Sequence, residues 1–188
     1  HDLLKGERAV VTTLFSDIRG FTHTSEIIDP ERLVNMLNDH LSTMTEIVVA
    51  HEGYVDKFVG DCVMVLYNAP ERQPDHALRA VTTALAMMAA HRRLMQQWAL
   101  LPPIGIGIDT GETIVGNLGS TQRNEYTAIG HHVNLASRLC GAAEGDQILI
   151  SATTYDLVRE AIVAEPVQSL KLKGLADAVG SYAVTGLK

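Results

Sequence analysis

The sequence predicts an α+β fold, an α/β sandwich built on a ferredoxin-like βαββαβ core with additional C-terminal strands and helices. Runs rich in Val, Ile, Leu and Thr alternate with stretches whose apolar residues have helical spacing. Over the first two thirds of the chain, these segments follow in the order strand, helix, strand, strand, helix, strand, and a further strand comes next. The 188 residues are 46% hydrophobic and 20% charged, which suits one globular core.

The first strand is expected over residues 6–18, GERAVVTTLFSDI, where β-branched residues are dense. The stretch RGFTHTSEII is expected to be a connection. Asp29 as N-cap and Pro30 in the first turn then start a helix, which Gly53 ends. Its apolar residues recur at helical spacing: Leu33, Leu37, Leu41, Met44 and Val48.

Two short strands follow at 54–59 and 62–67, joined by a tight turn at Gly60-Asp61. A second helix begins at Asp75. One face of it is apolar: Leu78, Val81, Leu85, Met88 and Met95.

The C-terminal third continues the alternation. IGIGIDTGETIVGNL is expected to form two strands around Thr110-Gly111, and YTAIG to end another strand. HVNLASRLCGAA forms a short helix and QILIS a strand. Ser151 caps the helix ATTYDLVREA, and SLKLKGLADAVGSYAV forms a final hairpin. No repeat or domain boundary interrupts the chain, so residues 1–188 are expected to be a single domain, excised from a longer protein because no Met begins it.

Composition argues against several function classes. The net charge of −7 and the absence of a basic patch do not favour a nucleic-acid binder. No apolar stretch is long enough to cross a membrane, and no signal peptide opens the chain. Cys62 and Cys140 lack CxxC spacing, which indicates two reduced thiols in a cytoplasmic domain, with a disulfide as the alternative. The eight histidines form no HxxxH pair and are expected mostly at the surface rather than at a metal.

Two aspartates suggest a metal site. Asp17 closes the first strand, and Asp61 lies in the turn between the second and third strands. The first and third strands are neighbours in a ferredoxin-like sheet, so both carboxylates can meet at one sheet end. Paired carboxylates suit hard divalent cations, especially when substrate phosphates complete the shell. Taken alone, each aspartate is more often an ordinary turn residue.

Other polar residues suit a phosphate-containing ligand. Gly20 permits a tight bend whose amides can cradle a phosphate, or forms a simple glycine turn. Asn134 and Arg138 share one helix face at i and i+4, where Arg offers a fork of donors; a solvated polar face is the alternative. Lys171 and Lys173 can meet a polyphosphate or protect an edge strand.

Three motifs in order, LFSDIRGFT, DKFVGDCVMVLYNAP and YTAIGHHVNLASRL, closely resemble the catalytic domain of class III nucleotidyl cyclases, most like bacterial class IIIb adenylate cyclases. The resemblance runs from Gly6 to the C-terminal hairpin. It implies conversion of ATP to 3′,5′-cyclic AMP and pyrophosphate. The ribose 3′-hydroxyl attacks the α-phosphate with the help of two divalent cations, Mg²⁺ or Mn²⁺.

The resemblance assigns the metals to Asp17 and Asp61, with a backbone carbonyl from Ile18. The β- and γ-phosphates are assigned to the amides of a short segment: Gly20, Phe21 and Thr22. The lysine that contacts the terminal phosphates corresponds best to Lys173, with Lys171 as the alternative.

The resemblance also assigns base and transition-state contacts. Lys57 and Thr127 match the two base-reading positions, Asn134 the residue that orients the ribose, and Arg138 the residue that stabilises the pentavalent α-phosphate. Lys57 can donate to N1 of adenine, and Thr127 can accept from its amino group. Guanine presents the opposite polarity, and guanylyl cyclases typically have Glu and Cys here, so ATP is favoured.

In this family the active site forms between two chains, one holding the metals and the other reading base and ribose. A chain with both sets is expected to form a head-to-tail homodimer with two equivalent sites. Thr127, where many relatives have Asp, resembles the subgroup that includes bicarbonate-responsive enzymes. An upstream regulatory or membrane domain in the parent protein stays an open expectation.

The His131-His132 pair departs from the family pattern, because relatives usually have a small or polar pair such as Asp-Thr here, and this leaves the shape of the base pocket open. A diguanylate cyclase is disfavoured because its Gly-Gly-Asp/Glu-Glu-Phe turn is replaced by residues 59–62, VGDC. A guanylate cyclase is a second possible function, and a catalytically silent module for dimerisation or nucleotide sensing is a third. The filled site positions favour an active enzyme over a silent module.

Overall fold

The computed structural model describes residues 5–170 and 179–188. The elements follow in the order β1 (Gly6–Ile18), α1 (Phe21–Ile27), α2 (Pro30–Ala50), β2 (Tyr54–Val59), β3 (Cys62–Tyr67), α3 (His76–Gln97), β4 (Ile104–Gly119), β5 (Asn124–Ile129), α4 (His131–Ala142), β6 (Gln147–Ser151), α5 (Ala152–Val158), β7 (Ile162–Leu170) and β8 (Val179–Leu187). Lys171 and Lys173, the lysines expected near the terminal phosphates, lie outside the described residues.

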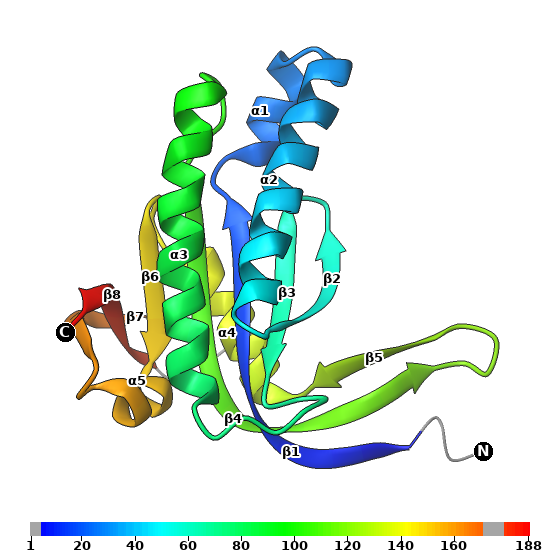
Figure 1. Ribbon diagram of the computed structural model, residues 1–188, viewed down its shortest axis with the longest axis vertical. Helices are drawn as coiled ribbons and strands as arrows, with labels where there is room; N and C mark the ends of the chain where they lie inside the picture. Colours follow the sequence, from blue (N-terminus) through cyan, green and yellow to red (C-terminus); the bar gives the residue numbers. More distant parts are fainter. Residues whose placement is uncertain (1–4, 171–178) are drawn as a thin grey trace.

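An eight-stranded mixed sheet organises the molecule, in the order β2-β3-β1-β4-β6-β8-β7, with β5 paired to β4 (Figure 1). β1 is antiparallel to both β3 and β4, and β4 is parallel to β6. The order β4-β1-β3-β2, with helices after β1 and β3, is the ferredoxin-like arrangement. The predicted fold class, including the additional C-terminal strands and helices, is confirmed.

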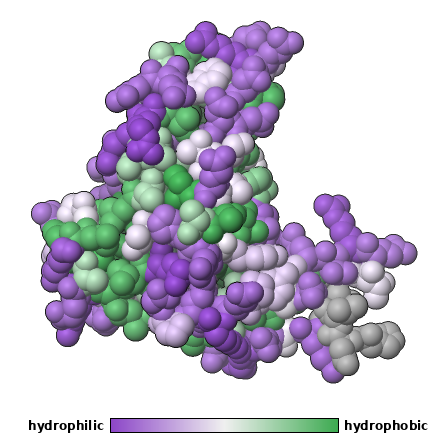
Figure 2. Space-filling view, in the orientation of Figure 1, coloured by the Kyte–Doolittle hydropathy of each residue, from purple (hydrophilic) through white to green (hydrophobic). Residues whose placement is uncertain are grey.

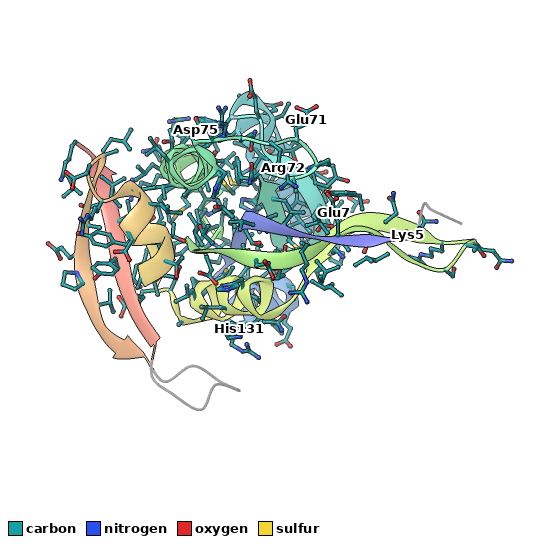
Figure 3. All side chains as sticks on the ribbon, turned by 90° about the horizontal axis from the view of Figure 1, so that it is seen from below. Lys5, Glu7, Glu71, Arg72, Asp75 and His131 are labelled. Atoms are coloured by element: carbon teal, nitrogen blue, oxygen red, sulfur yellow. The ribbon has the colours of Figure 1, made fainter. Side chains whose placement is uncertain are left out.

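Helices cover both faces of the sheet. α2 and α3 lie on one face and α4 on the other (Figures 1 and 3). The larger core packs between sheet and long helices and includes Leu14, Met44 and Ile106, all fully buried. α4 lies very close to β4, because a Cβ at Gly107 would stand 2.1 Å from the backbone nitrogen of Cys140. Glycine there lets the helix approach the sheet directly.

Two predictions of secondary structure were wrong. Residues 21–27, expected as part of a connection, form the short helix α1, which has no side-chain cap at its start. IGIGIDTGETIVGNL, expected as two strands, is one continuous strand, because β1 pairs with it on both sides of the predicted turn. Gly111 pairs with Val11 there, and its missing Cβ leaves space for the His132 ring, which a Cβ would meet at 2.2 Å.

The distal half of β4 and the whole of β5 form an arm that projects from the body, and the start of β1 pairs with β4 along its base (Figure 1). Its pairing runs from Ile114 with Ile129 to Gly119 with Asn124. The outer part of the arm is mostly hydrophilic (Figure 2). The outer part of the arm, residues 119–125, is exposed and therefore gains little from burial within its own chain.

The expectation that the histidines lie mostly at the surface was wrong for several of them. His40 on α2 and His91 on α3 are fully buried, and their Nδ1 atoms are 3.0 Å apart. His91 also bonds through Nε2 to the carbonyl of Pro102 at 2.7 Å.

Cys62 and Cys140 are both free thiols. Within residues 5–170 and 179–188, no helix is long and apolar enough to span a bilayer.

Candidate active site

The sheet brings Asp17 and Asp61 to the same end of the molecule. Asp17 is the penultimate residue of β1, and Asp61 occupies the β2–β3 turn, where Gly60 adopts a left-handed conformation with φ of +61°. β1 pairs with β3 as far as Ser16 with Val63. Asp61 consequently reaches the end of β1, where its Oδ2 accepts a 2.7 Å hydrogen bond from the backbone N–H of Ile18.

A surface cavity of about 380 Å³ joins these residues to the predicted phosphate loop. Its lining consists of Asp17, Ile18, Arg19, Gly20, Phe21, Thr22, Asp61 and Gly141. Gly20 has a φ of +65°, a conformation that favours glycine, and turns the chain from β1 into α1. The residues assigned to the metals and to the β- and γ-phosphates therefore line one cavity.

Arg19 was not singled out from the sequence, yet it ties this cavity to α4. Its Nη1 donates to the carbonyl oxygens of Cys140 at 2.9 Å and Ala143 at 2.8 Å, at the end of α4. Its Nη2 forms an ion pair with the Asp17 carboxylate. The guanidinium lies over Gly105, where a Cβ would stand 3.0 Å from Cζ. A single planar fork thus connects the aspartate of β1 to the last carbonyls of a helix.

The donor set at this cavity fits divalent cations. The Asp17 and Asp61 carboxylates and the Ile18 carbonyl are hard oxygen donors, which Mg²⁺ and Mn²⁺ prefer. In the described part of the chain, no three His, Cys, Asp or Glu side chains cluster as a complete metal cage. Two carboxylates with room beside them match cations that complete their coordination with substrate phosphates and water.

Lys57 and Thr127, assigned to the base, come from different strands but lie in one cluster. Lys57 on β2 donates to Glu125 Oε1 at 2.5 Å, and this hydrogen bond raises the pKa of Lys57. Thr127 on β5 donates to Asp56 Oδ2, also at 2.5 Å. Asp56 Oδ1 is 3.8 Å from Lys57 Nζ. Asp56 therefore stands between the two assigned base contacts.

Asp56 is buried because the regular pairing of β2 with β3 is broken between Val55 and Lys57. This β-bulge turns its side chain inward, and the side chain is 0% exposed. Burial raises the pKa of Asp56, and Thr127, Lys57 and the Ala128 amide act against this. Sequence reasoning missed Asp56, although a carboxylate beside Lys57 in an otherwise apolar strand was a signal for it.

Asn134 and Arg138 lie one turn apart on α4. Asn134 is exposed and Arg138 half-buried. Neither side chain makes a hydrogen bond or ion pair with another described residue. Both are therefore available to a group outside the described part of this chain.

The His131-His132 departure has a structural explanation. His132 Nδ1 lies 2.8 Å from Asp109 Oδ2, and the buried Asp109 also accepts from Ser151 Oγ at 2.5 Å and from its neighbour's amide. His131 is exposed at the start of α4, on the side away from the sheet (Figure 3). The second histidine thus serves the contact between helix and sheet, whereas the first leaves the packing unaffected.

Comparison with known families agrees with this architecture. The family model described as "Adenylate and Guanylate cyclase catalytic domain" matches residues 5–186. The chain belongs to this family. The predicted resemblance to class III cyclases is confirmed, and the chain is an enzyme domain of the cyclase type.

Individual relatives of the cyclase domain include enzymes of both base specificities. Adenylate cyclase 1 of Rhizobium meliloti is 36% identical over 186 residues, which are 96% of this chain and 28% of the relative. The crystal structure of adenylyl cyclase CyaB from P. aeruginosa is 42% identical with a TM-score of 0.93, covering 97% of this chain and 96% of the other. That of guanylyl cyclase Cya2 is 39% identical with a TM-score of 0.93, covering 98% and 96%.

These likenesses do not choose the base, since an adenylyl and a guanylyl cyclase structure match equally well. The chain also spans only 28%, 8% and 36% of the length of the first three curated relatives, all adenylate cyclases. The side chains of this cyclase domain therefore carry the information on substrate choice.

Proposed function

We propose that this domain is an adenylate cyclase, which converts ATP to 3′,5′-cyclic AMP and pyrophosphate. The observation that carries the proposal is the polarity of the base cluster. Lys57 presents an ammonium donor, which suits N1 of adenine. The proton of Thr127 is committed to Asp56, so its oxygen is left as an acceptor for the adenine amino group.

The chain's own residues divide the work of the reaction. Asp17, Asp61 and the Ile18 carbonyl hold two cations, Mg²⁺ or Mn²⁺. When bound, these supply positive charge that lowers the pKa of the ribose 3′-hydroxyl and neutralises the leaving pyrophosphate. The amides of residues 20–22 bind the β- and γ-phosphates.

The remaining groups act at the reacting atoms. Asn134 orients the ribose, and Arg138 places positive charge beside the α-phosphate as negative charge develops there. The 3′-oxygen forms a bond to the α-phosphorus and loses its proton, while the bond from that phosphorus to pyrophosphate breaks. Lys173, or Lys171 in its place, is proposed to contact the terminal phosphates.

We further propose that each site is shared by two copies of the chain in a head-to-tail homodimer. The support is that Asn134 and Arg138 lack partners among the described residues, while the metal cavity lies at the end of β1. Near the β2–β3 turn and the base of the arm, Phe58, Val59 and Ile129 expose 46%, 66% and 53% of their surface. Such apolar side chains suit burial against a second copy.

Turnover of the two nucleotides tests the proposal directly. Purified protein with Mn²⁺ should form cyclic AMP from ATP, and cyclic GMP from GTP much more slowly. A guanylate cyclase is the second candidate, because the guanylyl cyclase Cya2 structure is 39% identical. Faster turnover of GTP would support that alternative, and turnover of neither nucleotide would favour a catalytically silent module.

Regulation is proposed from residue type alone. Thr127 supports activation by bicarbonate, as in the subgroup with threonine at this position. The parent protein is proposed to carry a regulatory or membrane segment beside this domain, with the domain itself in the cytoplasm.

A further inference from the structure

The buried carboxylate of Asp56 occupies a position that the proposed chemistry leaves unassigned. Its Oδ2 accepts the Thr127 hydroxyl at 2.5 Å, and its Oδ1 lies 3.8 Å from Lys57 Nζ. Among the described residues, Oδ1 has no hydrogen-bond partner. The side chain is fully enclosed, so water cannot substitute for these contacts.

The contact with Thr127 fixes the direction of a hydrogen bond. A hydroxyl has one proton and two lone pairs, whereas an ionised carboxylate can only accept. Lys57 Nζ, 3.8 Å from Oδ1, favours the ionised form of Asp56, so the Thr127 proton points at Asp56 and only acceptor lone pairs are left for any other ligand. Without a neighbouring carboxylate, a threonine hydroxyl could rotate and either donate or accept.

The position of Lys57 predicts how the side-chain amide would be oriented if Asp56 were replaced by asparagine. In an Asp56→Asn variant, the cation beside Oδ1 attracts the amide oxygen to that side. The amide NH₂ then faces Thr127 and donates to its hydroxyl oxygen. The Thr127 proton is thereby released, and Thr127 can donate to an acceptor such as O6 of guanine.

We propose that Asp56 is a positioning residue that enforces adenine selectivity by holding Thr127 as an acceptor. This inference rests on the proposed function, because it concerns the base that the site prefers. Asp56 acts through Thr127 and does not itself touch the nucleotide. Selectivity at this site is thus set by a pair, one threonine and one buried aspartate on a neighbouring strand.

A double-mutant cycle tests whether Asp56 acts through Thr127. The measured quantity is the ratio of ATP to GTP specificity constants, kcat/KM, in wild type, Asp56→Asn, Thr127→Val and the double variant. Asp56→Asn should lower the ratio roughly tenfold. A change of this size corresponds to the free energy of about one hydrogen bond between neutral groups. In the Thr127→Val background, Asp56→Asn should change the ratio no further.

Control measurements separate selectivity from folding. Asp109→Asn alters another buried carboxylate, one that contacts Ser151 and His132 instead of the base cluster, and should leave the ratio unchanged. Thermal unfolding reports any loss of stability common to both variants. A merely structural role for Asp56 predicts equal losses for ATP and GTP, which would overturn the inference.

Other outcomes would also contradict the inference. If Asp56→Asn lowers the ratio by the same factor in the Thr127→Val background, Asp56 acts independently of Thr127 and the inference is wrong. Displacement of a fluorescent N-methylanthraniloyl ATP by ATP and by GTP reads the same ratio without turnover. If wild type forms no cyclic nucleotide, the proposed function fails. In that case an altered displacement ratio in Asp56→Asn still supports the pairing with Thr127, and an unaltered ratio contradicts it.

Discussion

The Asp61 carboxylate and the Ile18 backbone N–H are joined by a hydrogen bond of 2.7 Å. This contact fastens the β2–β3 turn to the end of β1 and holds Asp61 beside Asp17. Only Oδ2 is used, so the second Asp61 oxygen is available to a cation. Sheet pairing and one side-chain contact together build the proposed metal site.

Asp17→Asn and Asp61→Asn should each lower cyclic AMP formation by roughly a hundredfold or more, because metal-ion catalysis contributes several kcal/mol to the transition state. An amide oxygen can still accept from Ile18, so the fold should persist. Turnover at saturating Mn²⁺ and thermal unfolding would be measured together. Glu112→Gln, at an exposed ion pair with Arg8, is the matched control. Near-normal turnover in either aspartate variant would contradict the metal assignment.

Arg19→Met should destabilise the domain by about 2–3 kcal/mol, because charged hydrogen bonds to the Cys140 and Ala143 carbonyls are lost. Turnover should fall as well, since Asp17 loses its ion-pair partner. Denaturant unfolding measures the first effect and a Mn²⁺ titration of activity the second. Arg8→Met removes an arginine whose side chain is 77% exposed and should change neither. Equal stability and turnover in the two variants would show that the Arg19 contacts contribute to neither.

The buried His40–His91 pair should make the fold sensitive to acid. Burial, with a smaller effect of His91, lowers the pKa of His40 from 6.5 to about 3. The unfolded chain therefore binds a proton below pH 6.5 that the folded chain excludes down to about pH 3. Stability from His40 is complete above pH 6.5 and falls by about 1.4 kcal/mol per pH unit between these values.

Urea unfolding at pH 7 and pH 5 tests this sign. Wild type should lose about 2 kcal/mol more than His40→Leu over that interval, because the variant lacks the titrating group. His23→Gln changes an exposed histidine and should keep the wild-type dependence. An identical pH dependence in wild type and His40→Leu would refute the assignment.

Bicarbonate should raise the rate of cyclic AMP formation at fixed pH and ionic strength, with chloride as the control anion. The expectation follows from Thr127 and its likeness to bicarbonate-responsive enzymes. A Thr127→Asp variant should lose the response. A rate that does not change across the millimolar range would remove this proposal and leave the catalytic one intact.

The sequence predicted most of the fold because its signals were local. β-branched runs identified β1, and Asp29 with Pro30 identified the start of α2, where the Asp29 side chain caps the Arg32 amide. The helix α1 was missed because it is seven residues long and its N-cap, Gly20, has no side chain to cap it. Gly111 resembled a turn, although its role is a close approach to His132 that depends on the tertiary structure.

The site was predicted less completely, for a similar reason. Asp17 and Asp61 could be paired from strand order, because the end of β1 lies beside the start of its antiparallel neighbour β3. Asp56 stood out only as a charge in an apolar strand, and its place between Lys57 and Thr127 depends on a β-bulge that no local pattern marks. Arg19 likewise acts on carbonyls more than 120 positions away along the chain. Contacts of this kind depend on the folded sheet and on α4 together.

The shared site makes the sharpest prediction. Asp17→Ala removes a proposed metal ligand, and Arg138→Ala removes the proposed transition-state contact. Each variant alone should be nearly inactive. Mixed, they form heterodimers in which one site has both halves intact and the second has neither.

With free exchange of equal amounts, about half the dimers are mixed, each with one working site, so roughly a quarter of wild-type activity should return. Subunit exchange would be demonstrated separately with differently tagged chains. Specific activity of the mixture should also fall on dilution, because mass action separates the dimers. A mixture that stays inactive although exchange is complete would place both halves of the site within one chain and overturn the proposed homodimer.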